Sequence, residues 1–115
     1  MTNLIKNITW TNVKESNEVI KEIINQQALT NSEYVTNLVI NNGNVSFTTY
    51  SNISYDDLVK KLIRKKYSAD DEYKLHREAF INGLTTEFYE YNDYVEECKT
   101  QAKNFIEERN KVLGV

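Results

Sequence analysis

Residues 34–50, YVTNLVI-NNGN-VSFTTY, decide the fold of the N-terminal half of this chain. Asn42-Gly43 tolerates positive φ at both central positions of a type I′ turn, so the stretch predicts a β-hairpin with a two-residue loop. Branched and aromatic side chains then share one face, which we expect to be the core face. The predicted register pairs Ile40 with Val45, Leu38 with Phe47 and Thr36 with Thr49.

Upstream of this hairpin, the sequence predicts a further strand and a helix. Leu4, Ile8 and Trp10 share one parity, which is the period of a half-buried strand. Apolar residues in 17–29 are spaced as one face of a helix, and Ser16 and Asn17 precede them as possible caps. A strand through residues 19–24 fits the same apolar run.

The sequence of the second half of the chain predicts three helices. Ser54 before two aspartates and Ser68 before Asp70-Asp71-Glu72 are start signals, and Asn82-Gly83 is a stop signal. The first of these helices has an inner stripe of Leu58, Val59, Leu62 and Ile63. The last has a stripe that steps by three or four residues and that Gly114 would close: Phe88, Tyr91, Val95, Cys98, Ala102, Phe105, Arg109 and Val112.

We therefore expect one α+β domain over residues 1–115, with a small antiparallel sheet packed with long C-terminal helices. The last helix would span about 25 residues, or about 38 Å, whereas a globule of this size has a radius of gyration near ~13 Å. Its apolar stripe then needs another surface. Pairing with a second copy and packing across the sheet both satisfy that need.

Composition excludes several classes of function. The chain has 115 residues, 14 basic and 17 acidic, with a net charge of −3, so we expect no affinity for duplex nucleic acid. It lacks an apolar run near the ~20 residues of a membrane span, and its N-terminus lacks the order of a secretory signal. A single cysteine fits a reducing compartment. An asparagine-rich, proline-free composition is typical of a low-GC bacterium or its phage.

Catalytic constellations are also absent from the sequence. His76 and Cys98 are the only histidine and cysteine, and no phosphate-binding glycine motif occurs. Cys98 on the inner stripe is read as an inert apolar residue, and His76 as a solvated helix residue. Asp70-Asp71-Glu72 could bind a metal, but a helix N-terminus attracts carboxylates in any case. We expect no enzyme, no metal and no cofactor.

Three features could carry function, and each has a plain structural explanation. Five positive charges in residues 60–66 could steer a phosphorylated ligand or form a solvated helix face. Nine acidic and two basic residues in 70–97 could mimic nucleic acid or keep the protein soluble. Four rings in residues 88–94, FYEYNDY, point in several directions around a helix, so we expect some of them to meet a second surface. Packing against the sheet and a partner helix is the plain alternative for these rings.

The C-terminal half resembles a pattern in small phage and prophage proteins, carried by 66–72 (KYSADDE), Arg77, Glu87-Phe88, Tyr91-Asn92, 94–99 (YVEECK) and Ala102-Lys103. On these residues and its layout the chain resembles the anti-Thoeris family, non-enzymatic proteins that sequester cyclic ADP-ribose isomers made by TIR-domain enzymes, in pockets shared between protomers. The resemblance implies a phage-encoded homo-oligomer in the host cytoplasm. The stretch Leu84-Thr85-Thr86 departs from the charged lead-in expected there.

The resemblance also implies a binding site for a small nucleotide-derived signalling ligand. Phe88, Tyr91 and Asn92 would face the nucleotide, and Arg77 or Arg109 would lie near its phosphates. The alternative is a phage interaction protein, either an acidic decoy for a host nuclease or a virion-assembly accessory, which the acidic block suggests. A hydrolase that uses Asp70, Asp71 or Glu72 is a third reading.

Overall fold

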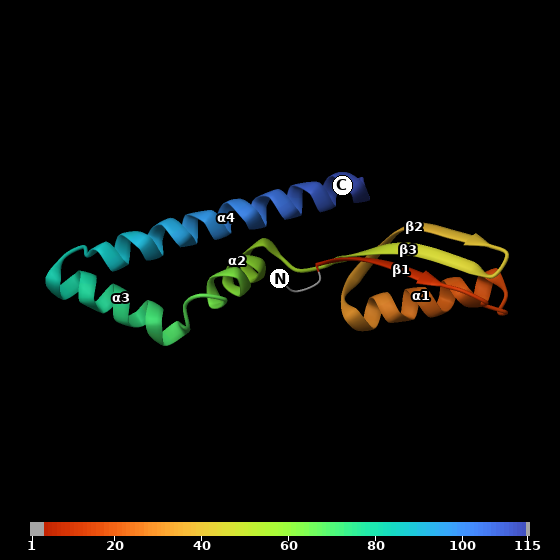
Figure 1. The fold of residues 1–115 in the computed structure, drawn as a ribbon, viewed down its shortest axis with the longest axis horizontal. Helices are drawn as coiled ribbons and strands as arrows, with labels where there is room; N and C mark the ends of the chain where they lie inside the picture. The colour runs from red at the N-terminus through yellow and green to blue at the C-terminus, as the bar shows by residue number, and fades with distance from the viewer. Residues whose placement is uncertain (1–3, 115) are drawn as a thin grey trace. The chain divides into compact units, whose positions relative to one another are not determined.

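The structure, a computed structural model, describes residues 4–114 and divides them into two compact units (Figure 1). The first unit comprises the residues up to Ile53 together with those from Val112 onward, and the second runs from Ser54 to Lys111. In chain order the elements are β1 (Ile5–Trp10), α1 (Asn17–Asn31), β2 (Glu33–Asn41), β3 (Asn44–Ser51), α2 (Tyr55–Arg64), α3 (Ala69–Asn82) and α4 (Thr86–Leu113). A sheet in the N-terminal half and a long C-terminal helix confirm the α+β class, whereas the single domain over residues 1–115 stays a prediction.

The predicted hairpin is present as β2 and β3, and β3 is the central strand of the sheet. The strand order is β1-β3-β2, and both pairings are antiparallel. Asn42 and Gly43 have φ of 48° and 81°, as a type I′ turn requires. The Gly43 carbonyl also accepts a 3.0 Å hydrogen bond from the Val13 amide. A Cβ at Gly43 would lie only 3.0 Å from the Val13 carbonyl oxygen, so this position needs glycine for two reasons.

The predicted register is correct only next to the turn. Ile40 pairs with Val45, but the register shifts between Thr36 and Val39, and Thr36 faces Thr48 in place of Thr49. Asn37 has a φ of 57°, so it adopts a left-handed conformation and creates a β-bulge. Asn37 and Leu38 together lie opposite Phe47, which corrects the predicted Leu38–Phe47 pair. The bulge lets both ends of β2 turn apolar residues inward, because it changes the parity of the strand.

The core of the first unit lies between α1 and one face of the sheet. Ile20 and Ile24 of α1 pack with Val45 and Phe47 of β3 in one buried cluster. The Trp10 ring meets Phe47 edge-on at 5.2 Å between centroids. The helical interpretation of residues 17–29 is thus confirmed, and a strand there is wrong. As predicted, Ser16 is the cap, and its hydroxyl accepts from the Val19 amide at 3.4 Å.

One ion pair lies on the inner face of the sheet. Lys6 Nζ of β1 donates to a carboxylate oxygen of Glu33 in β2 at 2.7 Å, across 27 residues of chain. Partial burial disfavours the charged form of Glu33, but the hydrogen bond and the positive charge of Lys6, together with a contribution from Thr49, outweigh this effect, and the pKa of Glu33 lies below its usual value. The pair thus links the two edge strands, β1 and β2, at the end of the sheet away from the Asn42-Gly43 turn.

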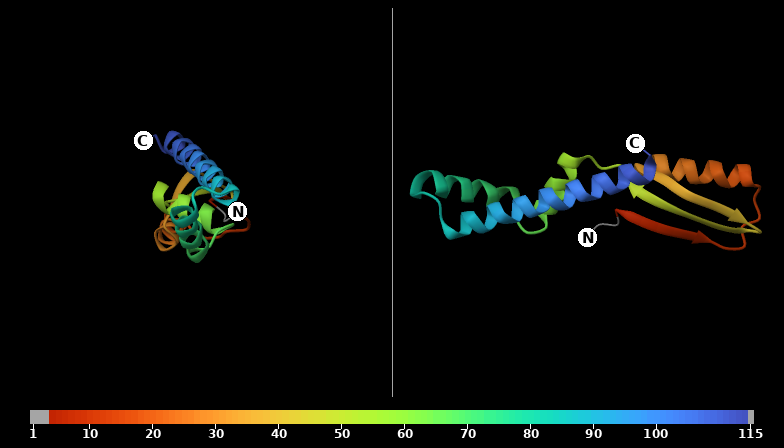
Figure 2. Two further views of the ribbon diagram at one scale, coloured as in Figure 1. Left: turned by 90° about the vertical axis from the view of Figure 1, so that its left-hand side faces the viewer. Right: turned by 90° about the horizontal axis from the view of Figure 1, so that it is seen from above.

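The second unit consists of helices, and the predicted start signals of α2 and α3 and the predicted stop signal of α3 are confirmed. Ser54 and Ser68 cap α2 and α3, and Ser68 forms a reciprocal capping box with Asp71. Gly83, with φ of 81°, terminates α3. The predicted inner stripe of α2 is buried in full: Leu58, Val59, Leu62 and Ile63. Figure 2 shows that α3 and the first part of α4 form an antiparallel hairpin.

Helix α4 spans 28 residues, which is somewhat longer than expected. Its predicted stripe is buried at Tyr91, Cys98, Ala102 and Arg109 and half-buried at Phe88, Val95 and Phe105, whereas Val112 is exposed. The Thr85 hydroxyl accepts a hydrogen bond from the Phe88 amide at 3.2 Å, so the stretch Leu84-Thr85-Thr86 provides the residue that caps the start of α4.

No helix among the described residues has both the length and the apolar character needed to cross a bilayer.

Candidate functional site

A cluster of rings lies inside the second unit, where α3 and α4 meet. Tyr91 contacts Tyr67 at 5.1 Å and His76 at 5.6 Å between centroids, both edge-on. Phe88 joins the cluster through His76 at 5.4 Å, and Tyr94 through Tyr67 at 5.6 Å. Tilted and edge-on contacts at these distances are the arrangements that aromatic rings prefer. The interpretation of His76 as a merely solvated residue is incomplete, because its ring packs against two others.

The cluster accounts for three of the four rings in the ring-rich stretch of α4, and the expectation that some of the four meet a second surface stays a prediction. Tyr91 is only 5% exposed, and Phe88 and Tyr94 are half-buried by residues of the same unit. Tyr89 alone among the four remains largely exposed, at 55%. The chain therefore covers three of these rings itself, because Tyr67 and His76 approach them from the preceding segment.

Beside the cluster, a polar triad ties the three helices together. The Tyr91 hydroxyl donates to one carboxylate oxygen of Glu72, and the Arg64 guanidinium donates to the other. Burial and the bond to Glu72 raise the pKa of Tyr91 to about 12. Burial alone would raise the pKa of Glu72, but the bonds from Tyr91 and Arg64 outweigh it, and this pKa is lowered. Both groups are thus held in their ordinary charge states at neutral pH.

Tyr94 occupies a second polar position between α2 and α4. Its hydroxyl donates to the Leu62 carbonyl oxygen at 2.8 Å, two residues before Arg64, where α2 ends. Lys66 Nζ lies over the Tyr94 ring at 5.1 Å and over the Tyr67 ring at 5.6 Å, which places an ammonium against two aromatic faces. Nearby Cys98 is buried, and this burial raises the pKa of its thiol, so the geometry agrees with an inert cysteine.

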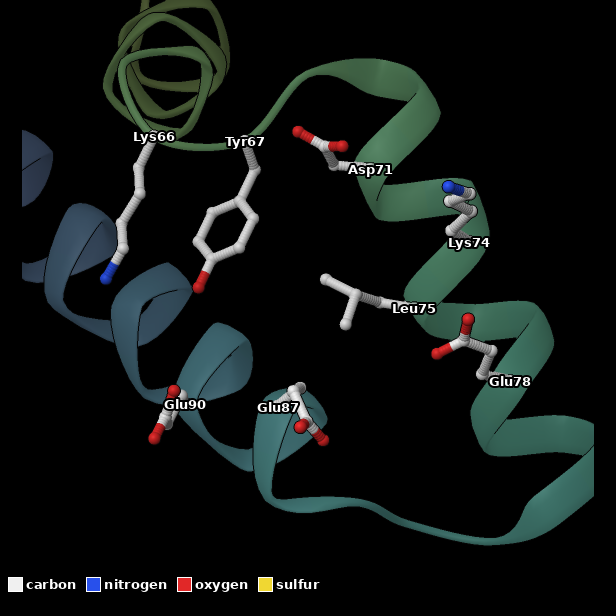
Figure 3. A pocket seen from close by; sticks show the side chains of 8 residues that line it. All are labelled: Lys66, Tyr67, Asp71, Lys74, Leu75, Glu78, Glu87 and Glu90. Atoms are coloured by element: carbon white, nitrogen blue, oxygen red, sulfur yellow. The ribbon is translucent and has the colours of Figure 1, made fainter.

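A groove of about 360 Å³ opens between α3 and the start of α4 (Figure 3). The Tyr67 ring points into it from the connection between α2 and α3, and Leu75 points into it from α3. Two lysines and four carboxylates complete its lining, so the lining has an excess of negative charge: Lys66, Lys74, Asp71, Glu78, Glu87 and Glu90. We call this the acidic groove.

The turn end of the same hairpin exposes large apolar side chains. Phe80 is 91% exposed, Ile81 67% and Leu84 58%, and we call these three residues the hairpin tip. Among the residues of α3, all of which the structure describes, none is buried. Nothing in the second unit itself therefore covers this end of α3.

The structure brings together only two of the five predicted site residues. Phe88 and Tyr91 lie 6.0 Å apart within the aromatic cluster, whereas Asn92 and Arg77 are exposed. Arg109 is buried, with its guanidinium over the Phe105 ring at 5.9 Å. It follows Tyr91 by 18 residues, which is about 27 Å along a helix. Within one chain these five side chains do not surround one small ligand.

Sequence reasoning missed Tyr67 and Leu75 as lining residues, and Glu72 as the acceptor for Tyr91, whereas Lys66 belongs to the basic run 60–66 that it named. One usable signal was the position of Tyr67 just before the cap Ser68, where an apolar side chain often fixes the entry of a helix. Asp71 forms the capping box, which supports the structural explanation of the acidic triplet at residues 70–72. Within the described part of the chain, no group of three or more His, Cys, Asp or Glu side chains is arranged to hold a metal ion.

Comparisons with known protein families, with curated proteins and with solved structures gave no match. The anti-Thoeris family expected from the sequence therefore stays a prediction.

Proposed function

We propose that this chain is a non-catalytic binding protein that presents the hairpin of α3 and α4 to a basic protein partner. A phage protein of this kind would act in the host cytoplasm as a decoy for a nuclease or as an accessory in virion assembly. The observation that carries the proposal is the exposure of α3, a 14-residue helix with no buried residue.

Helix energetics support this proposal. Isolated helices shorter than about 12–15 residues are marginal in water, and most helices in proteins are stabilised by a buried apolar face. The apolar side chains of the hairpin tip are instead left in solvent. Covering one such side chain contributes on the order of 1.5–3 kcal/mol, so a partner that covers several of them gains affinity and stabilises the hairpin.

Charge indicates the chemistry of that partner. Residues 70–97 hold nine acidic and two basic side chains, and all of them lie on α3 and α4. Fields of one sign speed the encounter with a surface of the opposite sign and disfavour partners of like sign. An acidic hairpin with an apolar tip thus suits a basic protein surface that also offers an apolar contact.

The test uses a labelled arginine-rich peptide as the probe for a basic surface and measures its fluorescence anisotropy at about 150 mM salt, where weak exposed pairs are screened. We expect the wild-type chain to bind the peptide and the variant Glu90→Lys/Asp93→Lys/Glu97→Lys to lose at least about tenfold in affinity. Circular dichroism checks that the variant is folded. Absence of binding by the folded wild-type chain would refute the proposal.

A second candidate function is the sequestration of a cyclic ADP-ribose isomer, which the resemblance implies. One observation favours it: the acidic groove offers the Tyr67 ring for a base and the Lys66 and Lys74 ammonium groups for phosphates. Four carboxylates in the same lining oppose a doubly charged ligand.

Titration calorimetry with cyclic ADP-ribose isomers, followed by release of the intact ligand on heating, tests this second candidate. Loss of binding in Lys66→Ala/Lys74→Ala but not in the control Lys65→Ala/Lys99→Ala would support it. Absence of heat with the wild-type chain, or a hydrolysed ligand, would exclude it.

A further inference from the structure

We infer that the acidic groove is the docking site for a short segment of the basic partner that carries an arginine or a lysine. This inference rests on the proposed function, and it specifies where on the hairpin of α3 and α4 the partner binds.

The groove has the size and walls that such a segment needs. Its volume of about 360 Å³ is at the lower end of the range for ligand pockets, and it holds a few side chains but no folded element. Tyr67 and Leu75 supply an apolar floor (Figure 3), and Glu78 of α3 and Glu87 and Glu90 of α4 also line the groove. A long cationic side chain can place its aliphatic stem on that floor and its charged end among the carboxylates.

The lining favours a cation over an anion. Four carboxylates against two ammonium groups leave the groove negative, so a phosphate or carboxylate entering it meets net repulsion. A guanidinium can pair with a carboxylate through two parallel hydrogen bonds and stack on a ring at the same time. Arginine therefore makes fuller use of this lining than lysine does.

The chain already shows that a cation is accommodated beside these rings. Lys66 Nζ lies 5.6 Å from the centre of the Tyr67 ring and 5.1 Å from that of Tyr94. Lys66 also lines the groove, so an incoming cation is repelled by it and competes with it for the Tyr67 ring. Removing Lys66 should then strengthen binding more than removing an equal charge outside the lining.

The experiment compares matched variants of the full chain, with the labelled arginine-rich peptide as probe and a citrulline version of it as the uncharged control. The groove variant Glu78→Gln/Glu90→Gln and the control Asp93→Asn/Glu97→Gln remove the same charge from exposed positions, but only the first pair lines the groove. We expect a loss of about tenfold or more in the groove variant, and a loss below about threefold in the control.

A second pair of variants tests the same inference by removing positive charges. Lys66→Ala and Lys65→Ala each remove one exposed positive charge, and only Lys66 lines the groove. We expect Lys66→Ala to tighten binding of the arginine peptide by at least about threefold relative to Lys65→Ala. Circular dichroism verifies the fold of all four variants.

The outcomes separate this inference from the proposed function. Equal weakening by the groove and control variants, or equal binding of the citrulline peptide, would overturn the groove as the docking site. In the first of these cases the acidic hairpin would still bind a basic partner, through diffuse charge. Absence of any binding by the wild-type chain would overturn both.

Discussion

Replacing Tyr91 by phenylalanine removes one hydroxyl from the interior of the second unit and leaves the ring in place. In the wild-type chain this hydroxyl donates to the Glu72 carboxylate, and Tyr91 is only 5% exposed. The substitution keeps the edge-on contacts with Tyr67 and His76, because they involve ring atoms. The change in the free energy of unfolding then reports the hydrogen bond between α3 and α4.

The expected magnitude follows from the charge and exposure of the acceptor. Hydrogen bonds to charged groups contribute on the order of 1.5–3 kcal/mol. Glu72 keeps its bond from Arg64, and its side chain is 22% exposed, so water can partly replace the lost hydroxyl. We therefore expect Tyr91→Phe to cost about 1.5–2 kcal/mol, in the lower half of that range.

Urea unfolding at pH 7, followed by circular dichroism at the helical minimum, measures this cost. Tyr89→Phe is the matched control, because Tyr89 lies on the same helix and is 55% exposed. The single tryptophan, Trp10, lies in β1, so its fluorescence follows the first unit separately. A shift in the helical signal without an equal shift in fluorescence would assign the loss to the second unit.

Two results would contradict the reasoning. The first is a Tyr91→Phe variant that is no less stable than Tyr89→Phe. The second is a cost that does not shrink in acid. The pKa of Glu72 is lowered from 4.5, so Glu72 becomes neutral as the pH falls through its folded value. The bond to Tyr91 should weaken there from a charge-assisted to a neutral hydrogen bond.

Three further predictions concern the rest of the chain. Gly43→Ala should lower the free energy of unfolding of the chain by about 1–3 kcal/mol, because φ is 81° and the new Cβ would lie 3.0 Å from the Val13 carbonyl oxygen. An unchanged midpoint of urea unfolding would exclude this strain. Glu33 and Glu72 have lowered pKa values, so each carboxylate stabilises the folded chain fully above pH 4.5, and this contribution is lost as the pH falls through the pKa of the folded state. The melting temperature, measured from pH 7 to pH 3, should show this decline. Cys98 should react with iodoacetamide at neutral pH much more slowly than a free thiol, because burial raises its pKa, and rapid labelling of the folded chain would contradict its burial.

The candidate site was only partly predictable from the sequence. The acidic excess of residues 70–97 and the ring-rich start of α4 are visible in the sequence, and both contribute to the region that the structure singles out. The roles of the rings are not visible there. Tyr91 turns inward because its ring packs against Tyr67 and its hydroxyl donates to Glu72. Glu72 lies 19 residues earlier in the chain, so the spacing within α4 does not reveal this contact.

Local signals in the sequence determined the secondary structure. Asn42-Gly43 sets a turn through its own φ preferences, and Ser16, Ser54 and Ser68 start helices by accepting from amides three residues ahead. Each of these effects needs only neighbours within a turn of chain, so periodicity and propensity reveal it. The buried stripe of α2 follows from the same spacing.

Tertiary structure alone decided the bulge at Asn37, the Lys6–Glu33 pair and the partner of Tyr94, which is Leu62, 32 residues away. The bulge lets both ends of β2 point apolar residues at one core, a requirement that the strand itself does not reveal. The two polar contacts form only where packing brings distant groups together and removes water from between them. Spacing along a sequence predicts which face of an element is apolar, but the surface that this face meets depends on the whole fold.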